Sequence, residues 1–539
     1  MASLLELSHE LLHCIFTDIS PTDLSSVSHT CKVLRNYISG NKLLHKDIYL
    51  RRYDQPASDT HWEQELHHLV KLEKILESSD SDAKPRYLGY VAFHIARLLG
   101  TSTIDPEDSL NIRLLEHHFG DTANAGAFLC SSALFGNSED TSFALETRQI
   151  SAKLHCLYGV PICESTARFP LAFWDSESEG PELDVKIEYR PRPLHPYARA
   201  KVYDLRQYTD ATLWGPFQND GSQRVDWEKL EAIMVVLGYN LNKFSDASHG
   251  LFPQIWDKPF RGANPRSYIS AAPSVASSKQ LDKELSRIRE LAPGLDALDP
   301  YGVTGTWMRV VCFLDYNDLY AFNFSPSNLR TPINEPRPPI DEEEGKINRG
   351  QAFDRCSRML TDSLSTAIRL IRVKWQVTKI EPPGSRSDKD DDEDEDDGLD
   401  WSNFQGERLP IVHFAGISRS LHASWDPNAN SKIRGKSLNN GSIERELRTD
   451  VERGTVRQTP EGQIRWTTFS IFHGEERWRS EGVQVGGLRS ARGVLGNWFD
   501  KYDPHVLWKV CFMVLVLTLD AQGLRRPRAC WADGFLEGE

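Results

Sequence analysis

The first residues of the chain with the types and spacing for chemistry are His9, Glu10 and His13, which fit the pattern H-E-x-x-H. On a helix this spacing places two imidazoles on one face as ligands for Zn²⁺, with a carboxylate beside them as a general base. The longer zinc motif continues with x-x-Gly-x-x-His, and here Phe16 and Ile19 occupy those two positions. No Glu lies between His13 and Leu44 to act as a third ligand. A zinc protease is therefore a minor alternative, and we predict no metal site.

Other signatures of catalysis are missing from the sequence. It contains no G-x-x-x-x-G-K-[ST] phosphate loop, no G-x-S-x-G nucleophile turn and no dinucleotide-binding glycine pattern. The 9 cysteines form no C-x-x-C pair, so we interpret them as reduced thiols of a cytoplasmic or nuclear protein. We predict no catalytic residue and no cofactor, and we expect a protein that is not an enzyme.

Length and charge limit the classes of partner. A chain of 539 residues is too long for one hydrophobic core and should fold as several domains. Its 63 Lys and Arg residues against 77 Asp and Glu residues give a net charge of −14, which repels nucleic acids and anionic lipids. The most apolar stretch, 506–519, includes Lys509 and is shorter than the ~20 residues that cross a bilayer. We predict no nucleic-acid and no membrane partner.

The elements that carry the first motif are amphipathic helices. Ser8 is a good N-cap for a helix with apolar residues on one stripe, namely Leu11, Leu12, Ile15, Phe16 and Ile19. Ser20 and Pro21 start a second predicted helix, with apolar residues recurring to Ile38, and a third is predicted at 43–51. Three such helices bury little surface among themselves, so we expect part of their apolar surface to need a partner.

These residues resemble an F-box, in the runs Leu7-Ser-x-Glu10-Leu11-Leu12-x-x-Ile15-Phe16, Pro21-x-Asp23-Leu24 and Val27-Ser28-x-Thr30-Cys31-Lys32. Family members usually have Pro where this chain has Ser8. The resemblance implies that residues 1–53 dock on the Skp adaptor, which a cullin holds in turn. The chain would then be the non-catalytic substrate receptor of an SCF-type ubiquitin ligase. By matched position, the adaptor-binding residues would be Leu7, Glu10, Leu11, Leu12, Ile15, Phe16, Pro21, Asp23 and Leu24.

Residues 54–300 read as a mainly helical middle domain. Helical spacing of apolar residues predicts helices over 62–76, 87–99, 141–158 and after Asp226, and a charged helix at 278–291. The stretch 163–194, rich in Pro and acidic residues, is predicted to be loop with short strands.

From residue 301 the pattern changes to strands. We predict a hairpin from 302–314 and 319–324, a half-buried strand near 371–378, and further strands at 409–417, 455–459, 463–472 and 477–485. The run 506–519 could close these roughly eight strands into an antiparallel barrel over 301–519. The predicted fold class is therefore α+β multidomain, with a three-helix F-box, a helical middle and a C-terminal antiparallel β-barrel.

The start of the barrel resembles the G-x-W opening of lipocalin-like barrels, with Gly305 and Trp307 in its key positions. That resemblance implies that Trp307 plugs one end, and the whole arrangement is similar to fungal F-box proteins with such a C-terminal half. The barrel would then recognise the protein to be ubiquitinated. The alternative is a barrel that binds a small ligand as a sensor, with an F-box that acts without a cullin.

Two segments are predicted to stay outside any core. Within 385–400, the stretch Asp388 to Asp397 has acids at every position except Lys389, and such a stretch cannot bury enough apolar surface to order itself. The tail 520–539 shows no apolar periodicity. We expect a solvated acidic loop within the barrel domain and an unstructured tail.

Overall fold

The structure is a computed structural model of the chain. It describes residues 4–56, 60–105, 107–120, 122–135, 144–159, 168–173, 186–191, 194–247, 256, 258–268, 294–314, 316–332, 337, 366–382, 409–420, 452–472, 475–500 and 511–517. The predicted helix at 278–291, the acidic loop at 385–400 and the tail at 520–539 lie outside these residues. None of the described helices is long and apolar enough to span a membrane.

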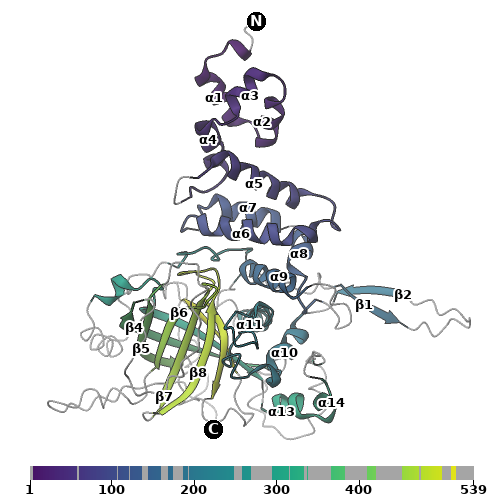
Figure 1. The fold of residues 1–539 in the computed structure, drawn as a ribbon. Helices are drawn as coiled ribbons and strands as arrows, with labels where there is room; N and C mark the ends of the chain where they lie inside the picture. Colours follow the sequence, from purple (N-terminus) through teal and green to yellow (C-terminus); the bar gives the residue numbers. More distant parts are fainter. Residues whose placement is uncertain are drawn as a thin grey trace, which may run out of the picture.

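The N-terminal helices form the tip of the molecule (Figure 1). They are η1 (Leu4–Glu6), α1 (His9–Asp18), α2 (Pro21–Ser28), α3 (Lys32–Ile38) and α4 (Lys42–Arg52). As predicted, Ser8 and Ser20 cap α1 and α2, because each side chain accepts a backbone N–H of the first turn.

The single helix predicted from Ser20 to Ile38 was wrong, since it is two helices. The chain breaks at Cys31, whose backbone is extended at φ −154° and ψ 162°. The Thr30 hydroxyl donates to the Val27 carbonyl at 2.7 Å, which offers the backbone a local alternative to continuing the helix. Four helices, rather than three, therefore follow η1.

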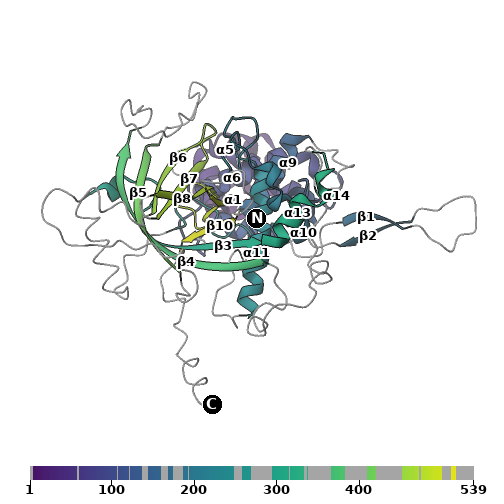
Figure 2. The ribbon, with the colours of Figure 1, turned by 90° about the horizontal axis from the view of Figure 1, so that it is seen from below.

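A stack of helices extends from this tip toward the barrel (Figure 1). Its members are α5 (Trp62–Glu77), η2 (Lys84–Tyr87), α6 (Leu88–Thr101), α7 (Leu110–Phe119), α8 (Thr122–Leu129) and α9 (Leu145–Tyr158). An antiparallel pair, β1 (Arg168–Phe173) and β2 (Lys186–Pro191), projects from the body (Figure 2). The connection to the barrel contains α10 (His195–Tyr203), η3 (Leu205–Gln207), α11 (Trp227–Ala247) and η4 (Leu295–Leu298).

The C-terminal half contains the predicted antiparallel barrel. Its strands are β3 (Gly305–Leu314), β4 (Thr366–Glu381), β5 (Ile411–Ser420), β6 (Glu452–Gln458), β7 (Ile464–Phe472), β8 (Glu475–Gln484), β9 (Val494–Asp500) and β10 (Cys511–Leu517). Each strand from β3 to β9 pairs with the next, and β10 pairs with both β9 and β3, so the sheet closes. The predicted α+β fold class is confirmed, and the apolar run after 506 supplies the closing strand.

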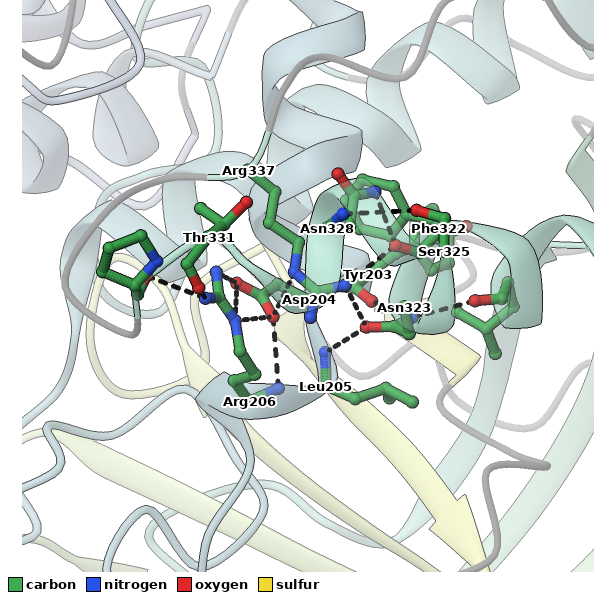
Figure 3. A network of polar contacts seen from close by, with 12 residues as sticks. Tyr203, Asp204, Leu205, Arg206, Phe322, Asn323, Ser325, Asn328, Thr331 and Arg337 are labelled. Carbon is green, nitrogen blue, oxygen red and sulfur yellow. Dashed lines mark hydrogen bonds and ion pairs between the residues drawn. The ribbon is translucent and has the colours of Figure 1, made fainter.

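The hairpin predicted from 302–314 and 319–324 was wrong, because the second half is helical. After β3 the chain forms α13 (Tyr316–Phe324) and α14 (Pro326–Leu329). Asn323 is buried on α13, where it donates to the Tyr203 carbonyl and accepts from the Leu205 backbone N–H, both at 3.0 Å. Figure 3 shows this network, in which Asp204 also binds Arg206 and Arg337. Contacts distant in sequence therefore stabilise a helix where local pattern indicated a strand.

The two faces of the barrel wall bury different residues. Inward-facing side chains of the strands form a core of their own, which includes Trp307, Trp375, Phe414 and Trp466. Outward-facing residues of β3, β8 and β9 belong instead to the core of the helices, as Val310 and Val483 illustrate. That helical core runs without interruption from Leu12 in α1 to Leu495 in β9. One side of the barrel is thus built into the helical part.

A buried ion pair on the outer wall of the barrel should make stability depend on acid. Glu481 is fully buried and accepts hydrogen bonds from Arg465 at 2.9 Å and from Arg479 at 2.7 Å. Burial alone would raise the pKa of Glu481, but these two guanidinium groups outweigh it and hold the pKa at about 2. Because the folded pKa lies below the ordinary value of 4.5, the pair stabilises the fold fully above that pH. The contribution is lost as the pH falls through about 2.

We therefore expect Glu481→Gln to lose stability at neutral pH and to show a smaller further loss between pH 4.5 and about 2 than the wild type. Urea unfolding across that pH range measures the difference. An unchanged dependence on pH in the variant would show that Glu481 does not contribute in this way.

Candidate adaptor-binding site

Three of the nine predicted adaptor-binding residues lie in the core of the N-terminal helices. Leu12, Phe16 and Leu24 are 4%, 2% and 3% exposed. The Phe16 ring also contacts Tyr37 of α3 edge-on, at 5.8 Å between centroids. These residues hold the helices together, which is the packing role that their helical spacing predicts.

The other six lie at least partly at the surface. Leu11 is 53% and Ile15 is 41% exposed, and they are one helical turn apart on α1. Glu10 and Asp23 are exposed, and Leu7 and Pro21 are half-buried. Hydrogen bonds from its own backbone N–H and from the Ser8 side chain lower the pKa of the Glu10 carboxyl. The surface of α1 therefore offers two apolar side chains beside an ionised carboxylate.

Sequence reasoning missed two exposed apolar residues in the short helix that precedes α1. Leu4 and Leu5 in η1 are 42% and 48% exposed. Their signal was a pair of leucines immediately before the motif, outside the helix that the periodicity marked. We name the exposed group Leu4, Leu5, Leu11 and Ile15 the α1 apolar face. Several exposed apolar residues within one short helical segment are typical of an interaction surface.

The H-E-x-x-H residues are arranged for packing rather than for metal binding. His13 Nε2 lies 2.7 Å from Asp47 Oδ2, which ties α1 to α4. The His9 ring packs edge-on against Tyr37, with 5.3 Å between centroids. Within the described ranges, no three His, Cys, Asp or Glu side chains gather in a way that could hold a metal ion.

A buried junction fixes the N-terminal helices to the stack below them. The Tyr53 hydroxyl donates to Glu73 of α5 at 2.7 Å. The next residue, Asp54, is 5% exposed, and its carboxylate accepts the backbone N–H groups of Thr103 at 3.0 Å and Leu110 at 2.9 Å. The second bond places the carboxylate at the start of α7, where it is favourable. The α1 apolar face is therefore carried on a firmly attached group of helices.

Trp307, the predicted plug, lies inside the barrel. Its side chain is fully buried, its Nε1 donates to the Val303 carbonyl at 2.9 Å, and its ring lies 4.9 Å from Trp466 and 5.4 Å from Trp375 between centroids. Tyr268, from the segment before β3, packs on it at 5.9 Å. The closure of one barrel end by Trp307 stays a prediction, with its position in the interior now described.

Comparisons with known proteins identify only the N-terminal part. The F-box domain model matches residues 4–46, which run from η1 into α4. No curated protein and no solved structure matches the chain. F-box domains in general belong to SCF-type substrate receptors, which are typically non-catalytic and bind a Skp-type adaptor and, through it, a cullin. Residues 4–46 of this chain are therefore an F-box domain.

Proposed function

We propose that the chain is the substrate-recognition subunit of an SCF-type ubiquitin ligase. The α1 apolar face and the neighbouring Glu10 and Asp23 bind the Skp adaptor, and the barrel half binds a target protein. The observation that carries this proposal is the exposure of Leu11 and Ile15, at 53% and 41%, on an F-box helix at the end of the molecule away from the barrel (Figure 1). Leaving two such side chains in water is unfavourable, and covering them with a partner removes that cost.

The way in which the F-box is joined to the barrel supports this function. A receptor acts by holding its target near a ubiquitin-charged enzyme, so the gain depends on a fixed distance and orientation. The buried core continues from Leu12 in α1 to Leu495 on the barrel wall. At the barrel, Arg492 donates to the Tyr158 carbonyl at the end of α9, at 2.6 Å. The helices thus act as a stiff spacer between the two binding surfaces.

The barrel interior favours a protein target over the alternative of a small-ligand sensor. Ring centroids of Trp375, Phe414 and Trp466 lie 4.7 to 5.9 Å apart, which is the spacing of a packed aromatic core. Arg309 and Glu452 form a further pair across the interior. An interior filled by its own side chains leaves the outer wall and the loops as the surface for a target.

The type of barrel, the kinship with fungal receptors and the cellular location are further parts of the proposed function. The G-x-W opening and the buried Trp307 support a lipocalin-like barrel, and the order of F-box, helices and barrel supports kinship with fungal receptors of that design. Cys14, Cys31, Cys130, Cys156 and Cys312 are free thiols, in keeping with a place in the cytoplasm or nucleus. The receptor itself supplies no catalytic group and no cofactor, and the adaptor, the cullin and the target are its partners.

Ubiquitin transfer in a reconstituted ligase tests the proposal without a known target. Receptors held on a cullin expose their own lysines to the charged enzyme, so we expect ubiquitin to be attached to this chain when adaptor, cullin and the ubiquitin-transfer enzymes are all present. Omitting the adaptor is the matched control and should abolish the transfer. Transfer that is equally strong without the adaptor, or absent from the complete mixture, would contradict the proposed function.

A further inference from the structure

The outer wall of the barrel has one stretch, on β5, β6 and β7, where every charged side chain that faces outward is cationic. Strands β5, β6 and β7 contain a single acidic residue, Glu452. Its side chain points inward, where Arg309 donates to it at 2.7 and 3.1 Å. Val456 and Trp466 also lie in the interior core, so the alternation of side chains along a strand puts Arg453, Arg457 and Phe469 on the outer wall.

The pairing of the strands brings these residues together. Arg453 pairs in register with Phe469 of β7, and Phe469 pairs with Arg479 of β8. The Arg479 guanidinium lies over the Phe469 ring, 5.4 Å from its centroid. We name Arg453, Arg457, Phe469 and Arg479 the barrel basic patch. Its two β6 arginines are four positions apart along the strand and the patch spans three strands, so it measures roughly 13 Å by 10 Å.

Charge and exposure distinguish this patch from the rest of the chain. The whole chain carries a net charge of −14, yet the patch brings three guanidinium groups together. Arg479 shares Glu481 with Arg465, whereas Arg453 is exposed and has no ion pair with any side chain that the structure describes. Phe469 is half-buried and supplies apolar surface between the cations. Seen from the side of Figure 1, no labelled helix lies over β6 or β7, whereas α11 lies beside β8.

We propose that the barrel basic patch binds an acidic segment of the target protein, which names the chemistry of the target and so rests on the proposed function. The fitting segment is extended, with carboxylates at two positions four residues apart and an apolar residue midway between them. It crosses the strands, so that one carboxylate pairs with Arg453, the apolar residue packs on Phe469, and the second carboxylate lies on the Arg479 side of the patch. Guanidinium groups suit this role because their planar donors match a carboxylate in two parallel hydrogen bonds.

A protein segment fits better than a nucleic acid. Nucleic-acid binding gains its affinity from the release of many counterions, and the net charge of −14 opposes the approach of a polyphosphate. Arg479 already covers one face of the Phe469 ring, where a base would stack. A short acidic segment needs only the local field of the patch.

Fluorescence anisotropy with the full chain tests the inference. The probe is a labelled synthetic peptide with two glutamates four residues apart and a leucine midway, and the matched probe has glutamine in place of both glutamates. We expect the wild type to bind the first peptide and not the second, and Arg453→Glu to weaken binding about tenfold or more. Arg330→Glu changes the net charge equally at an exposed site after α14 and should leave binding unchanged.

The remaining outcomes separate this inference from the proposed function. Equal binding by Arg453→Glu and the wild type, or displacement of the peptide by single-stranded RNA at lower concentration, would overturn the inference. So would binding that occurs only when the acids of 388–397 are replaced by asparagine, because the chain's own segment would then be the occupant. Adaptor binding, measured in parallel on the same variants, should stay intact. Its loss in the wild type would instead contradict the proposed function.

Discussion

Replacing the two large apolar residues that are exposed on α1, in the variant Leu11→Ala with Ile15→Ala, is expected to abolish measurable binding of the Skp adaptor. The two side chains are 53% and 41% exposed and one turn apart, so an adaptor groove would cover both. Truncating one central interface residue typically costs about 1 to 4 kcal/mol, and two neighbours together should exceed the affinity of most such complexes. Isothermal titration with purified adaptor measures the loss.

The control for this variant is Phe93→Ala on α6, which removes an apolar side chain that is 58% exposed outside the F-box. It should leave adaptor affinity unchanged. Leu12→Ala serves as a second comparison, because its side chain is buried and its loss should lower stability by about 2 to 5 kcal/mol. If the double variant binds the adaptor as the wild type does, the α1 apolar face is not the binding surface.

Arg309→Met is expected to lower the free energy of unfolding by about 3 to 5 kcal/mol. Arg309 and Glu452 are each 1% exposed and form a two-pronged ion pair inside the barrel, to which Trp375 Nε1 also donates at 3.2 Å. Removing the guanidinium leaves a carboxylate buried with a single neutral donor, and that uncompensated charge destabilises the fold.

The double variant Arg309→Met with Glu452→Leu should recover most of this loss, because it leaves apolar side chains in place of both charges. Arg224→Met is the matched control, since Arg224 and Asp220 form a pair whose side chains are 47% and 43% exposed. An exposed pair contributes at most ~1 kcal/mol. Urea unfolding of the four proteins completes the comparison. A double variant as unstable as Arg309→Met would show that the interior requires the charges for another reason.

Local patterns in the sequence predicted most of the elements. The Ser8 and Ser20 caps, the helix from Trp62, the helix after Asp226 and the strands of the barrel follow from apolar periodicity and capping residues. Closure of the barrel could also be expected, because an apolar run of strand length remained after the last predicted hairpin.

The break at Cys31 has a local cause, but two other failures arose because distant contacts decided the outcome. The segment 319–324 is rich in apolar and aromatic residues and was predicted as a strand, yet it is helical, and its Asn323 forms buried hydrogen bonds to Tyr203 and Leu205. The strand near 371–378 was predicted to be half-buried, yet its polar residues Lys374 and Gln376 are only 8% and 5% exposed. Gln376 donates to Asp296 of η4, which no period in the strand itself could reveal.

At the candidate site, too, local sequence patterns predicted some features, and contacts between distant residues decided the others. A motif could name Leu11, Leu12, Ile15 and Phe16 together, but their exposure separates two surface residues from two core residues. The barrel basic patch was not foreseeable from spacing, because Arg453, Phe469 and Arg479 become neighbours only through strand register. Their roles in binding remain predictions that the variants above test.

The most direct test of the central claim is equilibrium binding of the purified full chain to the Skp adaptor, followed by addition of the cullin. We predict a complex of one chain with one adaptor that joins the cullin as a single species in size-exclusion chromatography. Failure of the full chain to bind the adaptor, while its helices remain folded by circular dichroism, would contradict the claim that this F-box makes the protein a ligase receptor.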